Sequence, residues 1–184
     1  NRTRAYDPVN GNVIGECGGQ TQNLVPTPVV SGDLVFCTSG YRGSKLQAIK
    51  LGLTGDLTGT SAVAWEVDKD TPYVPSPLLY QGKLYVCSGN KEFISCYEAE
   101  TGKAYYTRQE LAALKGVYAS PVGAAGRVYF VGRNGVTCVL KNGKTLEFLS
   151  FNTLVVDIDC SPSVVGDTLY MKGKKHLYCI AAGE

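Results

Sequence analysis

The residues of this chain that could do chemistry are few and scattered. It has seven cysteines and one histidine, but no Cys-x-x-Cys pair, so a zinc site of the usual ligand spacing is not expected. The histidine, His176, lies in Lys172-Gly-Lys-Lys-His176, a segment typical of a solvated hairpin turn. The chain also lacks the Gly-x-Ser-x-Gly motif that presents a hydrolase nucleophile. We expect no catalytic residue, and the sequence favours a protein that is not an enzyme.

Carboxylates occur in two places where they could bind a cation. Asp157 and Asp159 are two residues apart, so in an extended segment both point to the same face, where they hold a cation or polar ligand or are simply hydrated. Asp56 lies in the glycine- and threonine-rich segment Gly52–Thr60. Its carboxylate and the nearby oxygens are a weak candidate for a calcium site. The alternative for Asp56 is a structured surface loop.

These residues are carried by a repeated unit. A proline followed by a short apolar run, a glycine-containing turn and an alternating strand occurs four times, and the prolines are 49, 44 and 41 residues apart: Pro28, Pro77, Pro121 and Pro162. This is the period of a four-stranded propeller blade. We expect these prolines to be structural. Helical patterning is limited to Gln109–Lys115, which predicts one or two turns in a loop at most.

The repeat resembles that of the pyrroloquinoline-quinone-like (PQQ-like) β-propeller family. The start of the family's repeat is similar to Ser76-Pro77, Ser120-Pro121 and Ser161-Pro162. Its later motifs are similar to Leu84-Tyr85-Val86, Ala5-Tyr6-Asp7, Thr101-Gly102-Lys103 and Trp65. The resemblance implies an all-β fold of about four four-stranded antiparallel blades in a single domain over residues 1–184. The expected blades are 1–22 (partial), 23–70, 71–115, 116–155 and 156–184 (partial). Trp65 has a structural role on an outer strand in this reading.

The two ends of the chain are offset within the repeat. Arg4–Gly11 matches Ser95–Gly102, so the chain starts with the last two strands of a blade. Asn12–Cys17 could supply the strand that is missing after Ala181, because sealing a ring removes exposed edges. We expect half of an eight-bladed ring, completed by a homodimer mate or by sequence upstream.

The repeat also suggests where a ligand binds. The innermost strand of each propeller blade lines the central channel, and five polar residues precede the inner strands: Asn23, Tyr73, Tyr118, Asp157 and Asp159. We expect these residues at the channel rim, where they can bind a small polar ligand. They can equally be hydrated.

Two functions follow from the resemblance. One is a non-catalytic binding or assembly scaffold for a protein or small polar ligand, without a cofactor. The other is a quinoprotein dehydrogenase-like domain that binds pyrroloquinoline quinone and calcium. It is disfavoured because the chain lacks the adjacent cysteines and tryptophan platform of those enzymes.

Composition narrows the partners. The formal net charge of +2 gives no reason to expect nucleic acid, and no apolar run is long enough to span a bilayer. We expect no signal peptide in the polar segment Asn1–Arg4. The periplasmic or extracellular location expected here, typical of secreted planctomycete-like bacterial proteins, therefore rests on the family resemblance alone.

Overall fold

The computed structural model describes residues 1–181, and every regular element in that range is a β-strand. Three complete antiparallel sheets follow one another along the chain. They are β3 (Val29–Ser31), β4 (Leu34–Ser39), β5 (Lys45–Lys50) and β7 (Val63–Val67); β8 (Leu78–Tyr80), β9 (Lys83–Ser88), β10 (Phe93–Glu98) and β11 (Ala104–Glu110); and β12 (Val122–Ala124), β13 (Arg127–Val131), β14 (Val136–Lys141) and β15 (Phe148–Thr153). The all-β propeller fold is confirmed.

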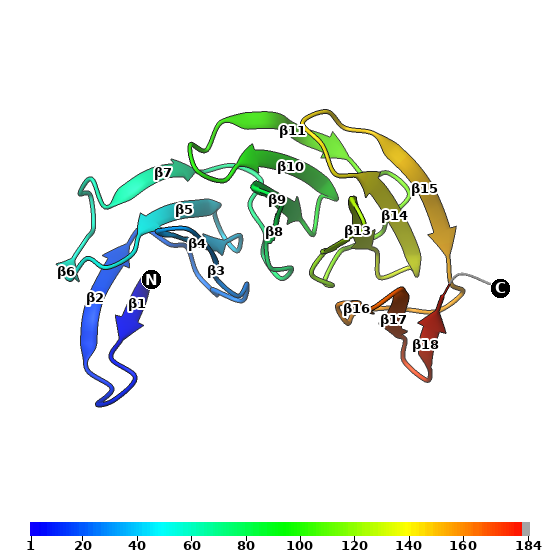
Figure 1. The fold of residues 1–184 in the computed structure, drawn as a ribbon, viewed down its shortest axis with the longest axis horizontal. Helices are drawn as coiled ribbons and strands as arrows, with labels where there is room; N and C mark the ends of the chain where they lie inside the picture. The colour runs from blue at the N-terminus through cyan, green and yellow to red at the C-terminus, as the bar shows by residue number, and fades with distance from the viewer. Residues whose placement is uncertain (182–184) are drawn as a thin grey trace.

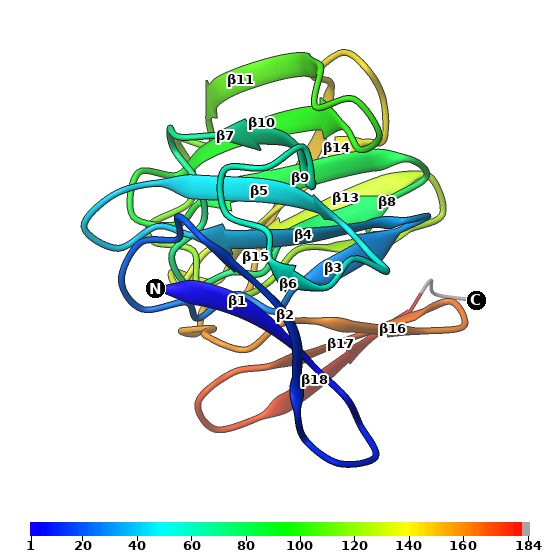
Figure 2. The same cartoon turned by 90° about the vertical axis from the view of Figure 1, so that its left-hand side faces the viewer.

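Shorter sheets stand at the two ends. The first contains β1 (Arg2–Tyr6), β2 (Val13–Gly18) and β6 (Gly55–Asp56), and the last contains β16 (Ser163–Val165), β17 (Thr168–Lys172) and β18 (Leu177–Ile180). We call the five sheets, in chain order, blades I to V. They form an open arc in which β3, β8 and β16 lie on the inside and β7, β11 and β15 on the outside (Figure 1). Viewed from the side, the strands of the middle blades run across the arc (Figure 2).

The core lies between the blades, because both faces of each complete blade are apolar. In β9, Leu84 and Val86 pack against blade II, whereas Tyr85 and Cys87 pack against blade IV. All four are at most 1% exposed. This is the period-2 alternation of a strand with a neighbour on each side. It explains why the sequence shows apolar residues on both faces.

The Thr-Pro or Ser-Pro entry of each repeat links the inner strands. The Thr27 amide donates to Ser76 Oγ, the Ser76 amide to Ser120 Oγ, and the Ser120 amide to Ser161 Oγ, each at 2.9 Å. Each hydroxyl therefore accepts the amide of the preceding blade. We call this chain of hydrogen bonds the hydroxyl ladder. The proline that follows each residue of the ladder has no amide hydrogen, so it needs no hydrogen-bond acceptor.

Trp65 packs across the blade II–III interface. Its ring centroid lies 5.6 Å from that of Phe36 and 6.2 Å from that of Tyr97, and its Nε1 donates to the Ala99 carbonyl at 3.1 Å. The turn that carries Ala99 closes over the ring, and a Cβ on Gly102 would lie 2.5 Å from Trp65 Cδ2. A glycine is therefore required beneath this tryptophan.

The equivalent of Trp65 in blade I is Gly15, and the structure gives the reason. The glycine- and threonine-rich segment of blade II contains β6, which pairs in parallel with β2 (Gly15 with Gly55). A Cβ on Gly15 would lie 3.1 Å from the Leu53 carbonyl oxygen. Main chain thus occupies the place that an aromatic ring takes in the next blade.

Two expectations about local structure need correction. Gln109 and Glu110 extend β11, and the turn expected within Gln109–Lys115 is limited to Leu111–Leu114, where the Leu114 amide donates to the Leu111 carbonyl at 2.9 Å. The apolar spacing there reflects burial of Leu111 and Leu114 between blades III and IV. The strand within Asn12–Cys17 does not pair with the C-terminal strands: β2 lies between β1 and β6.

Candidate functional site

In a four-stranded antiparallel meander, alternate connections lie at the same edge. The turns between second and third strands therefore share one face with the linkers that lead from each outer strand to the next inner strand. Each linker rests on the turn of its own blade: Thr71 Oγ1 donates to the Ser39 carbonyl at 2.7 Å, and the Val117 amide to the Gly89 carbonyl at 2.9 Å. We call this side the linker face. It comprises residues 19–28, 39–44, 68–77, 88–92, 111–121, 131–135, 154–162 and 173–176.

All five residues predicted at the channel rim belong to the linker face, but the structure does not bring them into one site. Tyr73 stacks on Tyr41 with ring centroids 5.2 Å apart. Asn23 is exposed and has a positive φ of 56°, a conformation that asparagine tolerates better than most residues. Their role in binding a ligand stays a prediction.

The other three predicted residues are joined by cations. The Arg133 guanidinium lies 4.2 Å from the centroid of Tyr118, and its Nε is 2.6 Å from Asp159 Oδ1. Asp157 forms an ion pair with Lys174, and this lysine holds the pKa of Asp157 below its usual range. Asp157 and Asp159 are thus each matched to a separate cation.

A polar hollow of the linker face lies between blades II and III, and we call it the II–III pocket. Its volume is about 460 Å³. The linker between the two blades, the 2–3 turn of each and one side chain of β11 form the walls. They are Gly40, Gly43, Ser44, Asp68, Lys69, Asp70, Thr71, Tyr73, Ser88, Gly89, Asn90, Lys91 and Arg108.

Asp70 is the buried charge of this pocket, with a side chain only 3% exposed. One carboxylate oxygen lies 3.5 Å from Lys91 Nζ, and the other forms an ion pair with Arg108. Such a carboxylate needs partners, because an unpaired buried charge is costly. Its backbone has a positive φ of 50°, which is uncommon for a residue other than glycine. A strained, buried carboxylate thus joins the linker to blade III.

The charges around the II–III pocket are unequal. Lys69, Lys91 and Arg108 face two carboxylates, Asp68 and Asp70. The side chains of Lys91 and Arg108 are 64% and 54% exposed, so both cations remain accessible to a ligand while they pair with Asp70. The pocket can therefore accept a small anion by charge-assisted hydrogen bonds.

Sequence reasoning missed this pocket except for Tyr73. The signal available was Asp68-Lys-Asp70 at the start of a linker, which looks like a solvated charge run. Arg108 lies 38 residues away in the chain. Only the packing of blade III on blade II brings it to Asp70.

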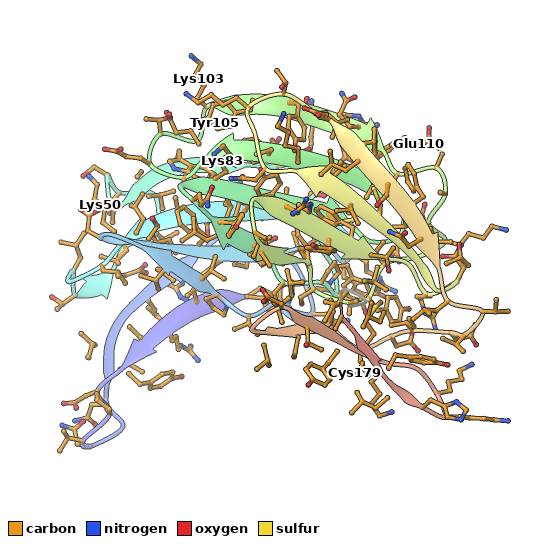
Figure 3. All side chains as sticks on the ribbon, turned by 45° about the vertical axis from the view of Figure 1, so that its right-hand side comes forward. Lys50, Lys83, Lys103, Tyr105, Glu110 and Cys179 are labelled. Atoms are coloured by element: carbon orange, nitrogen blue, oxygen red, sulfur yellow. The ribbon has the colours of Figure 1, made fainter. Side chains whose placement is uncertain are left out.

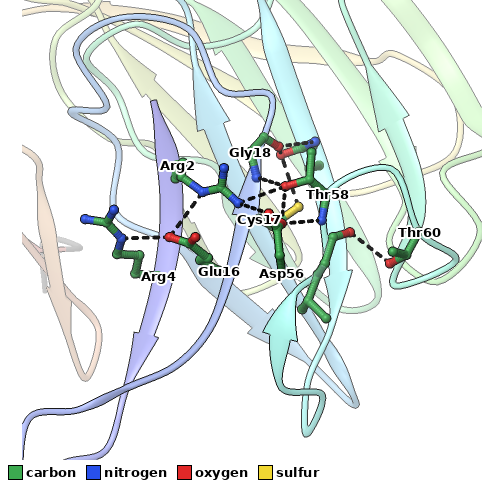
Figure 4. Close-up of polar contacts among 10 residues, drawn as sticks. Arg2, Arg4, Glu16, Cys17, Gly18, Asp56, Thr58 and Thr60 are labelled. Atoms are coloured by element: carbon green, nitrogen blue, oxygen red, sulfur yellow. Dashed lines mark hydrogen bonds and ion pairs between the residues drawn. The ribbon is translucent and has the colours of Figure 1, made fainter.

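Asp56 joins blade I to the loop of blade II (Figure 4). It accepts hydrogen bonds from the amide (2.9 Å) and hydroxyl (2.5 Å) of Thr58, and it lies 2.6 Å from Arg2 Nη2. These donors, the Thr58 hydroxyl above all, lower the pKa of Asp56 to about 2. Its oxygens thus serve the loop, and its binding of a cation stays a prediction.

Within residues 1–181, two absences concern metals and membranes. No three histidine, cysteine, aspartate or glutamate side chains in this range approach one another closely enough to hold a metal ion. No helix in it is long and apolar enough to cross a membrane.

Comparisons with known proteins support the fold. No protein-family model matches the chain, and no curated protein matches it. Among solved structures, the computationally designed Ika8 protein is 11% identical with a TM-score of 0.70, over 97% of this chain and 52% of that one. The computationally designed Ika4 protein is 12% identical with a TM-score of 0.67, over 94% and 99%. This chain therefore spans about half the length of Ika8.

A europium-containing methanol dehydrogenase is also similar. It is 16% identical with a TM-score of 0.53, and the match covers 68% of this chain and 24% of that one. At such identities these likenesses concern the fold alone.

Proposed function

We propose that the chain is a non-catalytic propeller scaffold that binds a small polar, anionic ligand on its linker face. The observation that carries this proposal is the II–III pocket, where accessible cations surround one buried carboxylate. A protein partner with an acidic loop would present the same chemistry. The hydrogen bonds between linkers and turns keep the pocket walls in place, which reduces the cost of ordering them on binding.

The test is isothermal titration with citrate as the anionic probe and glucose as the neutral one. We expect saturable binding of citrate alone. Lys91→Gln removes one exposed cation, while Arg108 still pairs with Asp70. This variant should weaken citrate binding by roughly 10- to 150-fold, since hydrogen bonds to charged groups contribute about 1.5–3 kcal/mol.

Lys103→Gln is the matched control, because Lys103 lies beside β11 at the opposite edge of blade III (Figure 3). Equal binding of citrate and glucose, or equal loss in both variants, would exclude the II–III pocket as an anion site.

The alternative is a quinoprotein dehydrogenase-like domain that holds pyrroloquinoline quinone and calcium. The carboxylates available on the linker face do not fit it well, because Asp157 and Asp159 are each neutralised by a cation. Trp65 lies on an outer strand and is packed against blade III, so it offers no platform at the rim. A thermal shift titration with the quinone and calcium tests this alternative, and a saturable rise in melting temperature would favour it over the scaffold.

A periplasmic or extracellular location agrees with a binding scaffold and rests on the family resemblance. Cell fractionation of the native host tests it. As for partners, we propose that the open arc is completed by further blades of the same kind, which a second copy of the chain can supply.

A further inference from the structure

The hydroxyl ladder has two free ends. Within the described part of the chain, no group bonds the Ser161 amide or Thr27 Oγ1. Every internal step joins these same two kinds of group, an amide before a proline and the hydroxyl at the equivalent position one blade on. The last blade therefore ends in a free donor and the first ladder residue in a free acceptor, so one end of the arc complements the other.

The exposure of the side chain at one repeat position shows which blades lack a neighbour. In the three complete blades it is held by Ala48, Cys96 and Cys138, all 0% exposed. In the end blades it is held by Ala5 and Cys179, and both are exposed. Figure 3 shows Cys179 on β18, at the end of the arc. A small side chain that is buried in every complete blade is exposed wherever packing stops.

Of the eighteen exposed large apolar residues in the described part of the chain, eleven lie at the same two ends, and the other seven lie on blade II and the linkers. Residues 78–110, the central blade, contribute none. The first blade exposes Tyr6, Val9, Val13 and Ile14, and the other end exposes Phe148, Leu149, Phe151, Val164, Val165, Leu177 and Ile180. Clustered apolar surface of this kind marks an interaction site. The two ends stand apart across the open side of the arc (Figure 1), so they do not cover each other.

We propose that a second copy of this chain covers both ends, in a two-fold ring of eight blades. The Ser161 amide of each copy donates to Thr27 Oγ1 of the other, which continues the hydroxyl ladder around the ring. Each copy contributes four inner strands, β3, β8, β12 and β16, and eight blades lie within the range of known propellers. A two-fold pair uses the same contact twice and leaves neither end open.

In this ring, blade V of one copy and blade I of the other merge into one shared blade. Two strands match its third position, β18 of one copy and β1 of the other. Arg2 ties β1 in place through Glu16 at 3.1 Å and Asp56 at 2.6 Å (Figure 4). In β18, by contrast, Leu177 is 68% exposed. We assign the position to β1, so that Ala5 becomes buried and β18 is displaced.

Sedimentation velocity of the whole chain over a wide concentration range tests the proposal, with unfolding by circular dichroism as the check that each variant folds. A concentration-dependent dimer is expected. Thr27→Val keeps the shape of the side chain but removes the acceptor. It should raise the dimer Kd by roughly 5- to 150-fold, because two junctions each lose a hydrogen bond. Thr107→Val, at an exposed threonine in the central blade, should leave the Kd unchanged.

A second pair of variants tests the strand assignment. Ala5 and Cys179 are both exposed in one copy, so glutamine at either place should leave that copy folded. Ala5→Gln should raise the Kd at least about tenfold by overpacking the shared blade, whereas Cys179→Gln should not. A monomer at all concentrations would overturn the proposal. The two apolar ends would then have to be covered by further blades of the same polypeptide. Weakening by Cys179→Gln alone would overturn the assignment of β1. Both results are independent of citrate binding.

Discussion

Gly102→Ala tests the close contact between the Trp65 ring of blade II and the turn of blade III that contains Gly102. Gly102 has a φ of +72°, and an added Cβ would lie 2.5 Å from Trp65 Cδ2. Two costs follow. The left-handed backbone costs alanine about 1–2 kcal/mol, and overpacking a well-packed site costs about 1–3 kcal/mol. We expect the free energy of unfolding to fall by about 2–5 kcal/mol in total.

Gly82→Ala separates the two costs. Gly82 has nearly the same backbone conformation, with a φ of +73°, but a Cβ there meets nothing within 4 Å. This control should lose only the backbone part, about 1–2 kcal/mol. The measurement is urea unfolding followed by far-ultraviolet circular dichroism, since the fluorescence of Trp65 would report on the perturbed ring itself. The slope of the free energy with urea should be the same in all variants.

A double-mutant cycle with Trp65→Leu completes the test. Leucine leaves room for the new methyl group, so in that background Gly102→Ala should cost no more than Gly82→Ala. The coupling between the two sites should then be about 1–3 kcal/mol, the overpacking part. If Gly102→Ala and Gly82→Ala are equally destabilising with Trp65 in place, the proposed contact does not limit the site and the reasoning is refuted.

Three further predictions concern the ladder, the thiols and acid. Ser120→Ala removes the acceptor of the Ser76 amide and should cost about 1 kcal/mol in urea unfolding; no loss would mean that water replaces the hydroxyl. Ellman's reagent at concentrations where the chain is monomeric should label two thiols quickly, Cys160 and Cys179, and the other five only on unfolding; fast labelling of more would contradict the buried positions. Because the pKa of Asp56 is lowered to about 2, its stabilising contribution is present above pH ~4 and lost as the pH falls towards ~2, so wild type and Asp56→Asn should converge there in stability.

The inertness of the buried thiols also has a physical cause. Burial raises the pKa of Cys87 and of Cys138 to about 12, so neither forms appreciable thiolate at neutral pH. Both lie in the core between blades III and IV. They act as small apolar residues that fill the space between strands.

The carboxylates were harder to interpret from sequence. Asp157 and Asp159 are two residues apart, which suggests a joint site, yet Lys174 and Arg133 hold them separately. Those cations come from the turns of two different blades. The spacing of residues along one linker contains no information about which turn will lie against it.

Local sequence alone determined the strands, the blade period and the entry motif. Alternation of side chains and turn-forming glycines act over a few residues, so they can be read without knowing the neighbours. Only the tertiary structure decided that Ser76, Ser120 and Ser161 form a ladder, that β6 takes the place of an aromatic ring, and that Asp70 is a buried carboxylate. Each of these depends on groups about 40 residues apart, and contact between them exists only once one blade packs against the next.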